Sequence, residues 1–203
     1  GVTIEKIFAL ENYRDQLASF PQTVWVSEDI LLDLADSQTP QGIVAVVQKE
    51  EVGQVDFSQG KFLFLEDVQD PGNVGTIIRT ADAAGFTGVI VSDKSADIYS
   101  LKTLRSMQGS HFHLPIYRMT SQALLEEAKE AGIPVLATTL SKDSVDYREL
   151  SPIENFVLVM GNEGQGISPI MAESANQLVH IGMKGRAESL NVAVAAGILM
   201  FYF

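Results

Sequence analysis

Residues 61–93 read KFLFLEDVQDPGNVGTIIRTADAAGFTGVIVSD, and their pattern indicates the fold class. The apolar run at 62–65 predicts a buried strand, and Pro71 with Gly72 predicts a turn soon after it. The residues that follow have the pattern of a helix, and a second apolar run begins at Gly88. A strand, a turn, a helix and another strand in this order are typical of a parallel sheet.

The same alternation continues to the end of the sequence. Beyond residue 93 we expect helices at 101–107, 122–131 and 190–203, and strands at 111–117, 133–140, 156–161 and 178–182. Short, uninterrupted apolar runs are typical of strands that are buried on both faces. The predicted fold class is therefore α/β, a mostly parallel sheet with helices on both faces.

The N-terminal quarter of the sequence follows a different pattern. We expect strands at 4–10, 24–27 and 42–48, with helices at 11–20 and from Glu28 onward. This segment is too small to bury a doubly wound core by itself. We interpret residues 1–52 as the remainder of a larger N-terminal domain, residues 53–60 as a polar linker, and residues 61–203 as the second domain.

The composition limits the cellular setting. The 203 residues contain no cysteine, which excludes disulfides and thiolate metal sites and suits the reducing cytoplasm. The sequence does not open with a basic and then apolar leader, and the apolar stretch at 190–203 is too short to span a bilayer. We therefore expect a cytoplasmic protein without membrane contact.

The net charge of −12 argues against a nucleic-acid partner, because phosphate binding usually requires a basic surplus. Between Ile98 and Ala123, however, three cationic side chains and two histidines occur without any acid. An acidic protein can thus still present a local basic face. Four side chains are candidate phosphate contacts, although ordinary solvated surface residues are an equally good interpretation: Lys102, Arg105, Lys184 and Arg186.

Three loops at the expected carboxyl ends of strands are rich in glycine, asparagine and charge, and ligands of open α/β sheets bind at such ends. In the first loop, residues 67–79, Asn73 is expected to cap the helix and Arg79 to lie about two turns into it. The second is G-x-x-G-x-G at residues 161–166. In the third, residues 182–191, Ser189 is the expected cap of the last helix.

Each loop alone also has a purely structural interpretation, as a capped helix or a glycine-rich turn with a solvated charge. The order of glycines at 161–166 differs from the G-x-G-x-x-G fingerprint, which disfavours a nicotinamide-dependent enzyme. His111 and His113 have no third ligand nearby in the sequence, so we expect no metal site.

Taken together, the three loops resemble the signature motifs of a known family. DPGNVGTIIRTADAAG, LVMGNEGQGIS and IGMKGRAESLNVAVAAG are similar, in order and separation, to the motifs of the SpoU (TrmH-type) RNA 2′-O-ribose methyltransferases of the SPOUT superfamily. The resemblance runs from about Phe62 to Phe203. Residues 24–47 are also similar to the latter part of a ribosomal-protein-like substrate-binding domain found in many members.

The resemblance implies a C-terminal deep trefoil knot, S-adenosylmethionine as cofactor, RNA as substrate, and a homodimer formed through the knot region and the last helix. Five residues match the family's catalytic motif positions: Asn73, Arg79, Glu163, Ser189 and Asn191. Six positions match its cofactor-binding residues: Thr138, Leu140, Gly161, Ile181, Met183 and Leu190. The sequence departs from the family at Gly182, where many members have proline; this change could loosen the loop.

The implied reaction moves a methyl group from a sulfonium to a ribose hydroxyl, and two roles for Arg79 stay open. It could clamp the neighbouring phosphate and stabilise the developing alkoxide, or a dry site could make it the base. We favour the clamp, because lowering an arginine pKa by five units costs roughly 7 kcal/mol. Glu163 is expected to orient Arg79 or one of the loops.

Two alternatives to the methylation of ribosomal RNA remain. The first is methylation of transfer RNA; ribosomal RNA is favoured over it only by the ribosomal-protein-like segment, which is an argument from analogy. A catalytically silent RNA-binding or ribosome-assembly factor on the same fold is the other alternative. The presence of Arg79, Glu163 and Asn191 argues against it, because a silent relative need not keep them.

Overall fold

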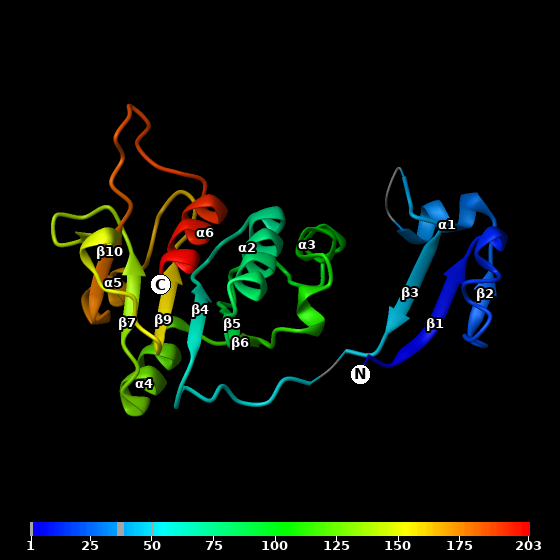
Figure 1. Cartoon of the computed structure of the whole chain (residues 1–203), viewed down its shortest axis with the longest axis horizontal. Helices are drawn as coiled ribbons and strands as arrows, with labels where there is room; N and C mark the ends of the chain where they lie inside the picture. Colours follow the sequence, from blue (N-terminus) through cyan, green and yellow to red (C-terminus); the bar gives the residue numbers. More distant parts are fainter. Residues whose placement is uncertain (1, 36–38, 50) are drawn as a thin grey trace. The chain divides into compact units, whose positions relative to one another are not determined.

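A computed structural model describes residues 2–35, 39–49 and 51–203. The chain divides into two compact units, Gly1–Glu51 and Val52–Phe203, which are described separately (Figure 1). Among the helices in these described ranges, none combines the length and the hydropathy that a membrane span requires. Residues 36–38, which fall inside the segment that resembles a substrate-binding domain, lie outside the described residues.

In its described residues the first unit is a small three-stranded sheet with one α-helix. Its strands are β1 (Ile4–Ala9), β2 (Thr23–Trp25) and β3 (Ile43–Val47), and its helix is α1 (Glu28–Ala35). The strand order is β2-β1-β3, with β1 parallel to β2 and antiparallel to β3. Ile7, Ala9 and Leu31 are its buried apolar residues.

The prediction of a helix at residues 11–20 is wrong. The structure has only a short 3₁₀ helix, Glu11–Tyr13, which is followed by turns. Leu10 occupies the position before this helix, and its apolar side chain makes no capping hydrogen bond, so the first backbone N–H groups gain no partner there. The Tyr13 hydroxyl instead donates to the carbonyl of Gln41 at 2.9 Å.

The second unit contains a seven-stranded sheet in the order β6-β5-β4-β9-β7-β10-β8. Every pairing between these strands is parallel, which confirms the predicted mostly parallel α/β sheet. The strands are β4 (Lys61–Leu65), β5 (Gly88–Val91), β6 (Ile116–Arg118), β7 (Val135–Thr138), β8 (Val145–Asp146), β9 (Phe156–Met160) and β10 (Gln177–His180).

Helices cover both faces of this sheet, as Figure 1 shows. They are α2 (Pro71–Ala83), α3 (Leu101–Met107), α4 (Ser121–Ala131), α5 (Pro169–Ser174) and α6 (Val192–Tyr202). Leu63 and Leu65 of β4 belong to the core that α2, α3 and α6 cover, whereas Phe62 and Phe64 belong to the core under α4 and α5. Because successive side chains alternate in direction, the apolar run of β4 fills both cores.

Two details of the second unit differ from expectation. The strand predicted at 111–117 begins only at Ile116, because Gln108 and Gly109 adopt left-handed backbone conformations that reverse the chain after α3. Ser110–Phe112 forms a 3₁₀ helix instead, so His111 and His113 are not neighbours on one strand face. The short β8 and α5 were also not expected from the sequence.

The predicted caps of α2 and α6 are each displaced by a few residues. Asp70, not Asn73, caps α2, since its Oδ1 accepts the N–H of Asn73 at 2.9 Å. Asn191, not Ser189, caps α6, and its Oδ1 accepts the N–H of Ala193 at 2.9 Å. The Asn73 side chain is therefore available for other contacts.

The end of the predicted linker packs within the second unit. Phe57 is buried and meets the Phe62 ring edge to face, with centroids 5.0 Å apart. The N–H of Gly60 donates to Asn155 Oδ1 at 2.6 Å. Phe57 and Gly60 thus attach the end of the predicted linker to the second unit, although Ser58 and Gln59 between them are exposed.

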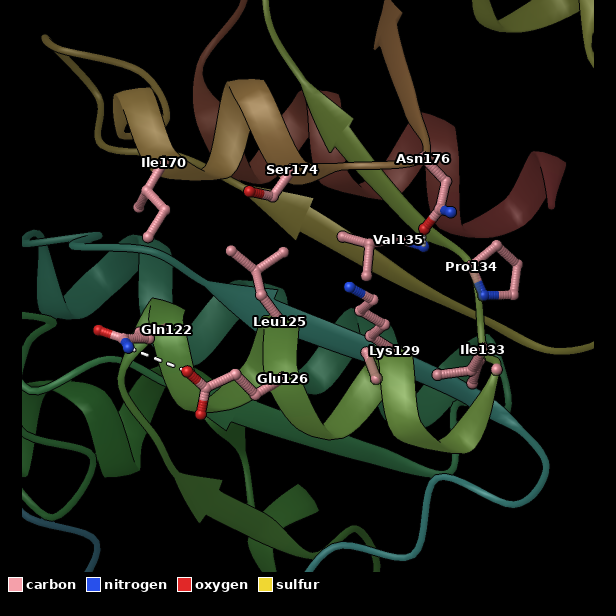
Figure 2. A pocket seen from close by; sticks show the side chains of 12 residues that line it. Gln122, Leu125, Glu126, Lys129, Ile133, Pro134, Val135, Ile170, Ser174 and Asn176 are labelled. Carbon is pink, nitrogen blue, oxygen red and sulfur yellow. Dashed lines mark hydrogen bonds between the residues drawn. The ribbon is translucent and has the colours of Figure 1, made fainter.

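An open groove of about 620 Å³ runs between α4 and α5 (Figure 2). Leu125, Lys129 and Ile170 lie along its sides, and Val135, the first residue of β7, lies at its base. Because residues that precede β7 and β10 also line it, the groove extends toward the amino ends of these strands, away from the three glycine-rich loops.

Close packing between α2 and α3 makes Gly75 a sensitive position. A methyl group at Gly75 would lie 2.6 Å from the carbonyl oxygen of Thr103 and 3.0 Å from the backbone nitrogen of Met107. We expect Gly75→Ala to lower the free energy of unfolding by about 1–3 kcal/mol, as overpacking commonly does. Thermal unfolding measures this loss. Gly53→Ala, where a methyl would meet no atom within 4 Å, is the control; equal melting temperatures would contradict the prediction.

Candidate functional site

The second and third loops line a cavity of about 640 Å³ at the carboxyl edge of the sheet, and hydrogen bonds join the first loop to both of them. The cavity lies beyond the ends of β7, β9 and β10, where ligands of open α/β sheets bind. All six predicted cofactor positions line it: Thr138, Leu140, Gly161, Ile181, Met183 and Leu190. Glu163, Ser189 and Asn191 of the predicted catalytic set line it as well.

The loop after β9 has a shape that its own backbone holds. Asn162 and Gly166 exchange two backbone hydrogen bonds of 2.9 Å, which close the loop into a tight turn. The Asn162 side chain accepts the N–H groups of Gly164 and Gln165 at 2.9 Å. Gly166 has a φ of +72°, a conformation that favours glycine.

Glu163 ties this loop to the loop after β4. Its carboxylate accepts the backbone N–H groups of Gln69 at 3.2 Å and Asp70 at 3.1 Å, and the Asn73 side-chain amide at 3.1 Å. Partial burial raises the pKa of Glu163, but the hydrogen bonds together outweigh it and hold the pKa below its usual value. Glu163 is therefore ionised at neutral pH and orients the first loop.

Asn73 and Asn191 connect the third loop to the other two. Asn191 Nδ2 donates to Asn73 Oδ1 at 3.0 Å, while Asn73 Nδ2 donates to Glu163. Asn191 also caps α6, so the helix is anchored at the same point. The chain Glu163–Asn73–Asn191, called the amide bridge below, brings together three of the five predicted catalytic residues.

Arg79 lies apart from this bridge. Its side chain is exposed and is not among the residues that line the cavity. Helix geometry places it about 9 Å further along α2 than Asn73. In the described part of the chain no hydrogen bond or ion pair joins Arg79 to Glu163, so Glu163 orients the first loop and not Arg79.

Sequence reasoning missed several residues that shape the site, Asp67 foremost. Asp67 has a φ of +58°, which is strained for a residue with a side chain. Its carboxylate accepts the Ser92 hydroxyl at 2.6 Å, and its carbonyl accepts Asn162 Nδ2 at 2.8 Å. Asp67 thus holds the second loop directly after β4 ends, and a strand-terminal aspartate before a D-P-G turn was the available signal.

The four candidate phosphate contacts have different surroundings. Arg105, Lys184 and Arg186 are exposed. Lys102 is paired with Asp70, with its Nζ 3.1 Å from Asp70 Oδ2, beside the start of α2. The N–H of Asn73 and the Lys102 ammonium together keep the pKa of Asp70 below its usual value. Lys102 therefore has a local structural role in addition to any contact with RNA.

The contacts of Glu163 predict a pH-dependent contribution to stability. Glu163→Gln is expected to lower the free energy of unfolding at pH 7 by about 1.5–3 kcal/mol, because a neutral amide binds the donors around it less strongly. Since the folded-state pKa of Glu163 is depressed, its contribution is complete above its unfolded-state pKa and is lost as pH falls through the folded-state pKa.

Urea denaturation at pH 7 and at pH 3.5 measures this effect, and the difference between wild type and Glu163→Gln should narrow at the lower pH. Glu173→Gln, at an exposed position of α5, is the matched control. A difference between wild type and Glu163→Gln that is equal at both pH values would contradict the prediction.

The cavity and the loops define an α/β protein that binds a small ligand at the carboxyl edge of a parallel sheet. Residues 60–201 match the SpoU rRNA Methylase family. The chain is 42% identical over 181 residues to the 23S rRNA (guanosine(2553)-2′-O)-methyltransferase RlmP of Bacillus subtilis. The aligned residues cover 89% of this chain and 72% of that protein. The protein belongs to the SpoU rRNA methylase family.

Solved structures agree with this membership. The AdoMet-bound rRNA methyltransferase of Sinorhizobium meliloti matches with a TM-score of 0.90 and 34% identity, over 100% of this chain and 80% of that one. The SpoU methyltransferase AviRb of Streptomyces viridochromogenes, in complex with AdoMet, matches with a TM-score of 0.83 and 30% identity, over 100% of this chain and 82% of that one.

Proposed function

We propose that this protein transfers a methyl group from S-adenosylmethionine to the 2′-hydroxyl of a ribose in ribosomal RNA. The observation that carries the proposal is the amide bridge, in which Asn73 joins two residues that line the cavity, Glu163 and Asn191, in a member of the SpoU family. Ribosomal RNA is favoured over transfer RNA because a relative that is 42% identical acts on 23S rRNA by its name.

The cavity suits S-adenosylmethionine in size and lining. Its volume of about 640 Å³ lies in the range of small-molecule sites. Ile181, Met183 and Leu190 offer an apolar surface for an adenine, and the backbone around Gly161 can approach the ligand closely. Both AviRb and the Sinorhizobium enzyme have structures with AdoMet, which supports the same cofactor here.

The cofactor supplies a methyl group on a sulfonium, and this chain's residues supply alignment and charge. In the reaction the ribose oxygen gains the methyl and loses its proton as the carbon–sulfur bond breaks. The amide bridge holds the three loops in place, which keeps the reacting atoms in line. Arg79 clamps the phosphate beside the ribose and stabilises the developing negative charge, while the phosphate or water accepts the proton.

Arg79 is outside the cavity of one protomer, and we propose that a homodimer completes the site. On α6 the apolar side chains of Val194 and Phe201 are 52% and 68% exposed, and Ile198 lies between them on the same stripe. Thr80, the neighbour of Arg79, lies against Gly197 of this helix. A second copy docked on the stripe would also approach the stretch of α2 that carries Arg79.

We also propose the trefoil knot of the SPOUT superfamily. The chain leaves β10, which lies beyond β7 in the sheet, and returns past β7 to place α6 against β9 and α2. Such a return across the loop that follows β9 supports a knotted connection.

The homodimer proposed on α6 is tested by sedimentation velocity of the purified protein.

The function is tested with purified protein, S-adenosylmethionine with a labelled methyl group, and RNA without modifications. We expect label in 23S rRNA, at a ribose that then resists alkaline cleavage, and none in transfer RNA. Label in transfer RNA alone would show that transfer RNA, and not ribosomal RNA, is the substrate. RNA binding without methyl transfer would favour the catalytically silent factor.

A further inference from the structure

The outermost strand of the large sheet places an ion pair next to the third loop. Asp146 ends β8, which pairs with β10, and its carboxylate lies directly under the turn that follows β10. Asp146 Oδ2 accepts the N–H of Gly182 at 3.2 Å. Gly182 lies between Ile181 and Met183, both of which line the cavity.

Arg148 binds this carboxylate in a bidentate manner, through two hydrogen bonds. Its Nε donates to Asp146 Oδ1 at 2.8 Å and its Nη2 donates to Oδ2 at 2.6 Å. These hydrogen bonds hold the pKa of Asp146 far below its usual range, so the acceptor of the Gly182 N–H stays charged. Charge-assisted hydrogen bonds of this kind are among the stronger ones in proteins.

Gly182 fits this arrangement both chemically and sterically. A methyl group at this position would lie 2.5 Å from Asp146 Oδ2 and 3.3 Å from Arg148 Nη2, so even alanine would displace the carboxylate. A proline would in addition lack the N–H that Asp146 accepts. We expected from the sequence that glycine could loosen this loop. The structure shows the opposite, because the Gly182 N–H is hydrogen-bonded to Asp146 of the edge strand.

The segment that carries Asp146 and Arg148 is itself fixed to α6. The Tyr202 hydroxyl donates to the carbonyl of Leu150 at 2.7 Å, and the Tyr147 and Tyr202 rings meet edge to face at 4.8 Å. Ala195 and Leu199 of the same helix line the cavity. The edge strand thus connects two walls of the cavity, the turn after β10 and α6.

We propose that Asp146, held by Arg148, is a positioning residue that fixes the backbone of Ile181–Met183 through the Gly182 N–H and thereby sets the affinity for S-adenosylmethionine. The proposal rests on the assignment of this cavity to the cofactor. Asp146 touches neither the cavity nor the reacting atoms and acts through the turn.

Asp146→Asn tests the proposal, because it removes the charge and the two-pronged pairing with Arg148 at nearly constant volume. The dissociation constant for S-adenosylmethionine, measured by calorimetry, is expected to rise about 5- to 20-fold. The kcat at saturating cofactor and the KM for RNA should stay within about twofold of wild type. Asp143→Asn, at an exposed position three residues earlier, is the matched control.

Hydrogen exchange of the Gly182 amide gives a readout that does not depend on activity, and exchange should become faster in Asp146→Asn. Gly182→Pro should weaken cofactor binding at least as much. Unchanged cofactor affinity in Asp146→Asn would overturn the positioning role, and so would a joint fall of kcat, RNA affinity and melting temperature. Either result would leave the proposed function standing. A wild-type protein that binds no S-adenosylmethionine would overturn the proposed function, and this inference with it.

Discussion

Arg79→Ala is expected to lower kcat for methyl transfer by about 100- to 1000-fold, the usual cost of removing one group that stabilises charge in a transition state. Arg79 is exposed and does not line the cavity, so the dissociation constant for S-adenosylmethionine should stay close to that of wild type. This combination follows from a guanidinium that acts on the RNA and the developing alkoxide and not on the cofactor.

Single-turnover kinetics with saturating RNA, together with calorimetry for the cofactor, measure both quantities. Lys129→Ala, on the groove between α4 and α5, removes a cation from the other face of the sheet and is the control. Arg79→Lys keeps the charge but not the two-pronged geometry, and an intermediate rate is expected. An Arg79→Ala variant that keeps most of its turnover would refute the catalytic role.

Gly161→Ala is expected to weaken the binding of S-adenosylmethionine by about 10- to 100-fold, because overpacking commonly costs about 1–3 kcal/mol and about 1.4 kcal/mol corresponds to a tenfold change in affinity. An added methyl group would lie 2.4 Å from the carbonyl carbon of Gly166 and 2.5 Å from the nitrogen of Ile167. These are backbone atoms beside the Asn162–Gly166 hydrogen bonds, so the turn has to open to make room.

Gly164→Ala is the matched control in the same loop, since the nearest atom to its added methyl group, Asn162 Oδ1, is 3.7 Å away. Calorimetry measures the affinity, and circular dichroism checks that both variants remain folded. Equal affinities in the two variants would show that the backbone packing at Gly161 does not shape the cofactor site.

The buried strands and the meeting of the three loops could be predicted from the sequence, because both follow from local patterns. Apolar runs such as 62–65 and 156–160 report burial directly, and the carboxyl ends of parallel strands share one edge. The caps of α2 and α6 could not be placed, because residues able to cap occur at both Asp70 and Asn73, and at both Ser189 and Asn191.

The amide bridge itself was beyond prediction from local pattern. It joins Asn73 to residues 90 and 118 positions later, and which oxygen accepts which amide depends on the packed arrangement. The tie between Asp146 and Gly182 was missed for a related reason. β8 has only two residues in a polar segment, and its apolar content is too small to signal a strand.

The central position of β9 has a consequence for how the protein forms during synthesis. β4 is the first strand of the large sheet to leave the ribosome, yet one of its two partners is β9, with Lys61 opposite Phe156. The nascent chain must therefore hold an unpaired apolar strand edge while almost a hundred further residues are translated. Such a delay favours association with chaperones, and a pause in translation before β9 would prolong the interval most exposed to aggregation.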